Sequence, residues 1–273
     1  MIRIRLVASD LDGTLLRSDR TVSPRTARAM AAAREVGIEV VWATARARHS
    51  VDELARSCGF RGEAICANGA VTLDLAGGTP EITGTVSIEV AEALAAMERV
   101  RTLAPGVVFA NVGATTFVAE PEYAALCDYT DHHRHPHEMT LAERLPLAGG
   151  RMVKIVARHP ELSSGELYRL AAEAGVDGVE LTHSGAPYVE MAASGVSKAS
   201  ALERLCAARG IGADEVAVIG DAVNDVPMLI WAGTALAPAN ALPEVLALAD
   251  RVLPSNDDDG VARYLEEVAG RRA

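Results

Sequence analysis

The chain has 273 residues, which is enough for one large domain or two modest ones. Its formal net charge is −11, from 37 acidic and 26 basic side chains. This balance argues against nucleic acids and anionic membranes as partners, because both require a basic surface. Aromatic residues make up only 4% of the chain, so aliphatic side chains must fill the core, as they do where helices pack on a buried sheet.

The four cysteines are scattered and include no close pair. This spacing argues against a zinc site or a disulfide framework and favours free thiols in a reducing compartment. No apolar run approaches eighteen residues, and the first residues read as a strand rather than as a secretory signal. We therefore expect a cytoplasmic protein without a membrane span.

Strand-like apolar runs alternate with helical patterns at both ends of the chain. In chain order these predicted elements are a strand over 4–9, a helix from Pro24 to Gly37 capped by Ser23, a strand over 38–43, a helix over 50–57, a helix over 198–209 and a strand over 216–220. This rhythm predicts an α/β fold, a Rossmann-like doubly wound parallel sheet with helices on both faces.

The middle of the chain has a different pattern. Helices are predicted over 90–101 and 165–174, and they are interleaved with strands over 107–111, 116–119, 152–157 and 179–182. We interpret this as an inserted α+β domain. The predicted boundaries are residues 1–83 and 190–273 for the core domain and 84–189 for the insert.

Polar residues follow three of the predicted core strands. The first strand ends in Asp10-Leu11-Asp12-Gly13-Thr14, the second in Thr44-Ala45-Arg46, and the last in Gly220-Asp221-Ala222-Val223-Asn224-Asp225. Ligands bind outside the carboxyl ends of strands in open parallel sheets. Strand direction alone therefore predicts that these side chains meet at one edge.

Two carboxylates at one edge repel each other unless a cation lies between them. Oxygen ligands suit Mg²⁺, which is commonly held by one or two carboxylates together with a substrate phosphate. With Mg²⁺ as cofactor, Asp10 could attack phosphorus as a nucleophile. Asp12 could protonate the leaving oxygen and then activate water, and Thr44 offers its hydroxyl to the phosphate.

Lys198 opens a predicted helix, where a cation opposes the helix dipole unless an anion is bound there. Lys154 and Lys198 are the only lysines of the chain, and a compact ammonium suits a crowded phosphate site. Each feature alone has a plainer interpretation, because an Asp-x-Asp turn, a capping threonine or a surface lysine needs no ligand. Their combination at the strand ends favours the chemical interpretation.

These segments resemble the motifs of the haloacid dehalogenase superfamily of phosphotransferases, and in particular its Cof-like branch with a C2B-type cap. The matching segments are LVASDLDGTLL from Leu6, WATAR from Trp42, EMAASGVSKASAL from Glu190, VIGDAVNDVPML from Val218, the tripeptide NGA from Asn68 and the stretch 240–261. The chain departs from the usual pattern in Ala45, Ala199, Ala222 and Val223, none of which replaces a charged catalytic group.

The resemblance implies a role for each matching residue. Asp10 and Asp12 are then the catalytic pair, and Asp12 favours phosphoryl transfer over dehalogenation. The implied phosphate-binding residues are Leu11, Thr44, Ala45, Lys198 and Asn224. The implied metal ligands are Asp10, Asp12 through its backbone oxygen, and Asp221, with Asp225 nearby and often acting through water.

The resemblance also implies that the insert chooses the leaving group of the substrate. Asn68 and Arg134 are candidate substrate contacts. The segment from His132 to His137 holds four histidines, which could bind a metal, contact an anionic group, or form a solvated loop.

Hydrolysis of a small phosphorylated metabolite, a sugar phosphate or a phosphorylated cofactor, is the leading hypothesis. A phosphosugar mutase of the same superfamily is the alternative, followed by a non-catalytic phosphate-binding protein. The sequence indicates no oligomeric state.

Overall fold

The computed structural model describes residues 3–132, 134–143, 145, 152–175, 178–182 and 186–272. The chain forms two compact units. The first unit comprises Met1–Gly84 and Ser197–Ala273, and the second comprises Thr85–Val196. The second joint lies after Val196, and not after residue 189 as the sequence predicts, because strand β11 (Val189–Ala193) pairs within the sheet of the second unit.

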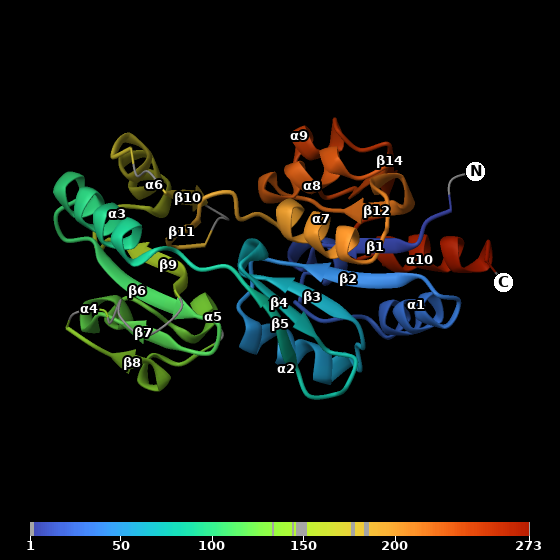
Figure 1. Ribbon diagram of the computed structural model, residues 1–273, viewed down its shortest axis with the longest axis horizontal. Helices are drawn as coiled ribbons and strands as arrows, with labels where there is room; N and C mark the ends of the chain where they lie inside the picture. The colour runs from blue at the N-terminus through green and yellow to red at the C-terminus, as the bar shows by residue number, and fades with distance from the viewer. Residues whose placement is uncertain are drawn as a thin grey trace. The chain divides into compact units, whose positions relative to one another are not determined.

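The first unit is built on an eight-stranded sheet of order β14-β13-β12-β1-β2-β3-β4-β5 (Figure 1). The pairings from β14 to β3 are parallel, and β4 runs antiparallel to β3. The strands are β1 (Leu6–Ser9), β2 (Glu39–Ala43), β3 (Glu63–Cys66), β4 (Val71–Asp74), β5 (Glu81–Thr85), β12 (Val216–Ile219), β13 (Thr234–Pro238) and β14 (Arg251–Leu253). A mainly parallel sheet with a separate inserted sheet confirms the predicted α/β class.

Helices cover both faces of this sheet (Figure 1). The helices of the unit are α1 (Pro24–Glu35), α2 (Arg48–Cys58), α7 (Lys198–Ala208), α8 (Val226–Trp231), α9 (Pro243–Leu246) and α10 (Gly260–Gly270). Helices α1 and α10 pack against each other on one face, and α7 and α8 contact each other on the opposite face. Helix α1 begins as predicted, with the Ser23 hydroxyl accepting a hydrogen bond from the Thr26 amide at 3.0 Å and Pro24 in the first position.

Alternate residues of the central strands form the core under α7 and α8. Leu6 and Ala8 of β1 and Val41 of β2 are fully buried there with Leu202 of α7 and Met228 of α8. Burying an aliphatic side chain of this size stabilises a fold by roughly 1.5–3 kcal/mol. These packed strands support the polar residues that follow their carboxyl ends.

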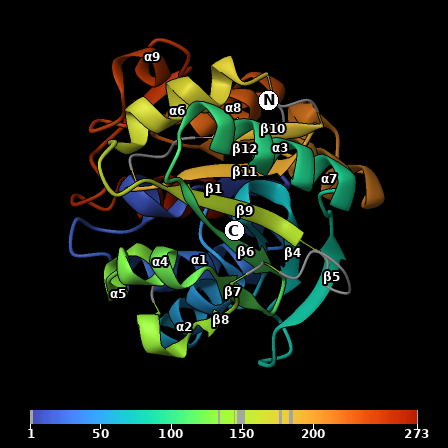
Figure 2. The same cartoon turned by 90° about the vertical axis from the view of Figure 1, so that its left-hand side faces the viewer.

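The second unit is built on a six-stranded sheet of order β10-β11-β9-β6-β7-β8. Its pairings are antiparallel except that of β7 with β8, which is parallel. Besides β11, its elements are β6 (Val108–Gly113), β7 (Phe117–Ala119), β8 (Thr140–Leu141), β9 (Met152–Arg158), β10 (Val179–Thr182), α3 (Val90–Leu103), α4 (Pro121–Ala125), α5 (Tyr129–His132) and α6 (Ser164–Glu173). Helices α3 and α6 lie side by side on one face of the sheet, and α4 lies on the other face (Figure 2).

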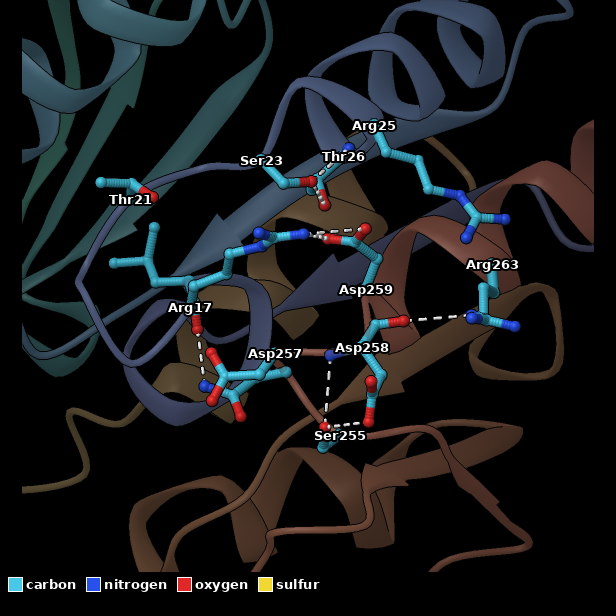
Figure 3. Close-up of polar contacts among 12 residues, drawn as sticks. Arg17, Thr21, Ser23, Arg25, Thr26, Ser255, Asp257, Asp258, Asp259 and Arg263 are labelled. Carbon is cyan, nitrogen blue, oxygen red and sulfur yellow. Dashed lines mark hydrogen bonds and ion pairs between the residues drawn. The ribbon is translucent and has the colours of Figure 1, made fainter.

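A loop after β14 anchors the segment that follows the first motif. Asp259 forms an ion pair with Arg17 at 3.1 Å, and Ser255 caps its own loop through Asp258 (Figure 3). The side-chain amide of Asn256 donates to the Leu16 carbonyl at 2.9 Å. The stretch after residue 240 thus fixes the turn that carries the first two aspartates.

None of the helices in the described part of the chain combines the length and apolar character needed to cross a bilayer.

Candidate active site

The three polar strand ends lie together in the first unit because β1 pairs in parallel with both β2 and β12. Asp10 directly follows β1, Thr44 follows β2, and Gly220 and Asp221 follow β12. Parallel neighbours end at the same edge of a sheet. The predicted convergence is therefore a direct consequence of strand order.

Lys198 joins two of the carboxylates. Its Nζ atom donates to Asp10 Oδ1 at 2.6 Å and to Asp225 Oδ1 at 2.7 Å. Lys198 and Asp225 are almost completely buried, and Asp10 is only 5% exposed. Asp225 Oδ2 accepts the backbone amides of Asp221 and Ala222 at 3.0 and 3.1 Å, so both of its oxygens have protein donors and it positions Lys198.

Asp221 completes the group on the other side of Asp10. Its Oδ1 accepts the Thr14 hydroxyl at 2.6 Å. Gly13 makes this approach possible, since its φ is +82° and a Cβ there would lie 2.4 Å from an Asp221 carboxylate oxygen. The side-chain amide of Asn240 donates to the Gly13 carbonyl at 2.7 Å and holds this turn in place.

Carboxylate oxygens of Asp10, Asp221 and Asp225 lie within 4.8 Å of one another, and in the described part of the chain no other group of acidic, histidine or cysteine side chains has metal-site spacing. Lys198 forms ion pairs with Asp10 and Asp225, so the three carboxylates carry more negative charge than this one lysine can balance. Oxygen donors of this kind fit a hard divalent cation. Asp10 and Asp221, two of the three predicted metal ligands, thus have the chemistry and spacing for such a cation, and Asp225 belongs to the same cluster.

Burial and the excess of negative charge shift the pKa values of the residues in this cluster. Burial raises the pKa of Asp10 well above its usual value, and repulsion from Asp225 and Asp221 adds to the effect while Lys198 opposes it. Burial also raises the pKa of Asp221, against the hydrogen bond from Thr14. Burial alone would lower the pKa of Lys198, but Asp10 and Asp225 together raise it above its usual value. A cation bound among the carboxylates would favour their ionised forms.

Asp12 lies outside this buried cluster. Its carboxylate is about half exposed and forms a two-point ion pair with Arg46, with Nε–Oδ2 at 2.6 Å and Nη2–Oδ1 at 2.5 Å. Arg46 also donates to Ser50 Oγ at 3.4 Å. This arginine is a site residue that the sequence analysis included only as part of the second motif, and its bidentate geometry fixes the Asp12 carboxylate.

A second group of residues borders the cluster on the β2 and β3 side. Thr44 is buried, and its hydroxyl accepts the Arg46 amide at 3.1 Å. The Asn68 amide donates to the Thr44 carbonyl at 3.0 Å, and Asn224 Nδ2 donates to Asn68 Oδ1 at 3.2 Å. Asn68 therefore links two predicted phosphate-binding residues.

The turn that carries Asn68 also approaches the helix of Lys198. Gly69 has φ +107°, and a Cβ there would lie 2.2 Å from the Ser197 carbonyl oxygen. Any side chain at this position would push away the start of α7. Leu11 and Ala45, whose backbone amides are implied phosphate donors, lie directly after Asp10 and Thr44, and Leu11 is fully buried.

Arg134 and the histidine segment belong to the second unit. The Arg134 guanidinium lies 5.6 Å from the centre of the Phe117 ring. His132 Nε2 is 2.8 Å from the Tyr123 hydroxyl, and the rings of His135 and His137 are stacked. His133 lies outside the described residues. No histidine belongs to a potential metal site among the residues that the structure describes.

The chain is similar to known proteins over most of its length. The family model for haloacid dehalogenase-like hydrolases matches residues 7–265. The chain is 29% identical to the HMP-PP phosphatase of Serratia proteamaculans (strain 568) over 96% of its own length and 94% of the relative. It is 26% identical to the pyridoxal phosphate phosphatase of Escherichia coli (strain K12) over 96% and 97% of the two chains.

The fold is also similar to that of a solved structure. A haloacid dehalogenase-like hydrolase from Bacteroides thetaiotaomicron superposes with a TM-score of 0.79 at 24% identity, covering 97% of this chain and 100% of the other. This similarity extends through both units. The family match over nearly the whole chain confirms the predicted superfamily: the chain belongs to the haloacid dehalogenase-like hydrolases and is a phosphatase of that superfamily.

Proposed function

We propose that this phosphatase hydrolyses small phosphorylated metabolites with Mg²⁺ as its cofactor and Asp10 as the nucleophile that carries the phosphoryl group. The supporting observation is the cluster at the β1 edge, where three carboxylates lie within 4.8 Å of one another and one buried lysine pairs with two of them. Such a cluster has an excess of negative charge that a divalent cation would balance. Mg²⁺ is commonly bound by one or two carboxylates together with substrate phosphate oxygens, so the phosphate of the substrate would supply a further ligand.

The two chemical steps follow from the roles of two aspartates. Asp10 Oδ forms a bond to phosphorus while the bond from phosphorus to the leaving oxygen breaks, and Asp12 gives that oxygen a proton. Asp12 then accepts a proton from water, whose oxygen attacks the phosphorus of the aspartyl phosphate and releases inorganic phosphate. The Asp12 carboxylate is about half exposed, so water can reach it for the second step.

The remaining residues bind and orient. Lys198, Thr44 and Asn224, with the Leu11 and Ala45 amides, are proposed to hold the phosphate. Asp10 and Asp221, with the Asp12 backbone oxygen, would hold Mg²⁺, and Asp225 supports them from its hydrogen bonds to Lys198 and the Asp221 amide. The bound ion would neutralise the phosphate and stabilise the charge that develops during transfer.

The physiological substrate lies within a broad class. The two curated relatives named above act on different compounds by their names, HMP-PP and pyridoxal phosphate, at similar identity to this chain. We therefore propose a phosphorylated cofactor, a cofactor precursor or a sugar phosphate. The second unit is the proposed source of leaving-group selectivity.

The central test is phosphate release from a panel of phosphorylated metabolites, measured with Mg²⁺ and with excess chelator. We expect wild-type turnover that is nearly abolished by chelation, and a loss of about 10⁴-fold or more in Asp10→Asn. Circular dichroism should show that Asp10→Asn stays folded. Turnover that survives either change would refute the proposed mechanism, and a bisphosphate-activated isomerase assay on the same panel would detect mutase activity.

The contribution of the second unit has its own test. Arg134→Ala should change the ranking of substrates, since its guanidinium carries a charge that is not buried. Arg101 provides a matched control, because it also lies over a phenylalanine ring, at 4.8 Å from Phe109. Identical substrate rankings in Arg134→Ala and the wild type would remove Arg134 from the proposed substrate contacts.

A further inference from the structure

Arg48 is a cation near the candidate active site that has no described partner. It is the first residue of α2 and follows Thr44 by four positions. Its Nε atom is buried and has no hydrogen-bond acceptor within the described residues. Among the described acidic side chains, none lies within ion-pair distance of Arg48. An unpaired buried donor is costly, so such a group calls for an explanation.

The other arginines of the same segment are paired. Arg46, two residues earlier, forms the bidentate ion pair with Asp12. Arg56, two turns further along α2, pairs with Asp52 at 3.2 Å. The segment therefore does not lack acidic residues in general. The missing partner is specific to Arg48.

Arg48 also lies at the start of a helix, where the helix dipole adds a partial positive charge to that of the guanidinium. The first turn of α2 contains no acidic residue, and Ala47 offers no side-chain cap. A cation there opposes the positive end of the helix dipole. An anion bound next to Arg48 would interact favourably with both the guanidinium and the dipole.

The residues just before Arg48 are hydrogen-bonded to the turn that carries Asn68. The Ala67 amide donates to the Arg46 carbonyl at 2.9 Å, and the Asn68 amide donates to the Thr44 carbonyl at 3.0 Å. Cys66, which precedes these two residues, is close enough to feel the charge of Arg48: burial raises the pKa of this thiol, and Arg48 opposes the shift. The backbone that leads into Arg48 is therefore tied to the turn that links Thr44 to Asn224.

From this placement we propose that Arg48 binds a second anionic group of the substrate, a carboxylate or a further phosphate, while Lys198 and Thr44 hold the phosphoryl group that is transferred. This inference rests on the proposed function and narrows its substrate class to phosphate esters with two anionic groups. The guanidinium is suited to this role because its planar fork matches carboxylate and phosphate oxygens in a two-point contact.

The test compares substrates that differ only in the second anion. Glycerol 3-phosphate and 3-phosphoglycerate form a pair that tests a carboxylate, and fructose 6-phosphate and fructose 1,6-bisphosphate form a pair that tests a phosphate. In Arg48→Gln we expect kcat/KM to fall about 10- to 100-fold for at least one doubly anionic substrate. Its singly anionic counterpart should change by less than about twofold, a small fraction of one such hydrogen bond.

Two further variants separate the role of Arg48 from a general effect of charge. Arg48→Lys should recover part of the loss because it keeps the cation, and Arg56→Gln on the same helix should leave both members of each pair unchanged. An equal fall for all substrates in Arg48→Gln, or no fall for any, would overturn the inference while leaving the phosphatase mechanism intact.

Binding provides a readout that does not depend on turnover. Calorimetric titration of the same four compounds, with Mg²⁺, into Asp10→Asn and into Asp10→Asn with Arg48→Gln gives the affinities directly. We expect weaker binding of a doubly anionic compound only when Arg48 is changed. Equal affinities in the two proteins would refute the second anion site even if the chain proved inactive on every substrate.

Discussion

The only two lysines of the chain are both buried, one in each unit, and their surroundings differ. Lys198, at the start of α7, is 1% exposed and donates to Asp10 and Asp225, with the Asp221 carboxylate also in the cluster. Lys154, within β9, is 5% exposed and forms an ion pair with Glu190 on β11. One lysine is outnumbered by carboxylates at a sheet edge, and the other forms an ion pair with a carboxylate on a neighbouring strand.

This contrast separates two uses of a buried charge. Within the protein, the charges of a buried ion pair can balance each other without a ligand. For the Lys154 pair, the Thr182 hydroxyl also donates a hydrogen bond to Glu190 at 3.2 Å. A cluster with more carboxylates than cations lowers its energy by binding a further cation. We therefore expect the Lys198 cluster to determine activity and metal binding, and the Lys154 pair to determine the stability of the second unit.

The largest expected effect is that of Lys198→Met. Loss of a charged donor to the transferred phosphate should lower kcat by about 10²–10³-fold. It also leaves the carboxylates of Asp10 and Asp225 without their shared cation, so thermal unfolding in excess chelator should occur at a lower temperature, with partial recovery in Mg²⁺.

Lys154→Met is the matched control for this variant. Its stability should fall to the same extent with and without Mg²⁺, because Lys154 has no part in the metal cluster. An equal response of the two variants to Mg²⁺ would erase the proposed distinction between the two lysines.

The second effect concerns the Lys154 pair itself. Glu190→Gln removes the carboxylate that faces Lys154 and should lower the free energy of unfolding by about 3–5 kcal/mol, the range for removing one partner of a buried ion pair. Changing both residues, Lys154→Met with Glu190→Gln, should recover most of the loss. Denaturant unfolding measures both values, and a double variant that is less stable than Glu190→Gln would contradict the interpretation of a simple pair.

These two lysines also show how far sequence reasoning reached. Lys198 was predicted to bind phosphate because a cation at a helix start opposes the helix dipole unless an anion is bound there; in the structure its ammonium donates to Asp10 and Asp225. The predicted domain boundary placed Glu190 at the start of the second core segment. It lies instead in β11, and its pairing with Val156 depends on tertiary register that a single sequence does not reveal.

The contacts made by Asp12 were equally hard to predict. Its position two residues after Asp10 indicated a catalytic role, but the direction of its side chain depends on a guanidinium 34 positions away. The π-type turn after β1 and the left-handed Asn68 are local conformations fixed by neighbouring loops. Sequence patterns predicted which elements deliver the site residues, and the hydrogen bonds among loops decide how those residues point.

A smaller effect should appear when Mg²⁺ binds the cluster at Asp10. A ligand that binds only the folded state stabilises it by about 2.7 kcal/mol at a concentration 100 times its Kd, so Mg²⁺ should raise the unfolding temperature of the wild type. Asp221→Asn should lose most of this gain, because it removes a cluster carboxylate within 4.8 Å of the others. Asp257→Asn, which removes a carboxylate from an exposed loop of the same unit, should keep the full gain in unfolding temperature. A gain that is unchanged in Asp221→Asn would place the ion elsewhere.

The smallest expected effect concerns Asp257, an exposed carboxylate that is held by hydrogen bonds, in contrast to the carboxylates that are paired with the two buried lysines. Asp257 accepts the Ser18 hydroxyl at 2.6 Å and the Ser18 amide at 2.9 Å, and these bonds lower the pKa of Asp257 below its usual value. A lowered pKa in the folded state means that the ionised form stabilises the protein. This contribution is complete above the pKa of the unfolded chain and is lost as the pH falls through the lowered value. A carboxyl-carbon NMR titration should show the low pKa in the wild type and a return toward the usual value in Ser18→Ala. Equal pKa values in the two proteins would mean that the Ser18 hydroxyl does not favour the ionised form of Asp257.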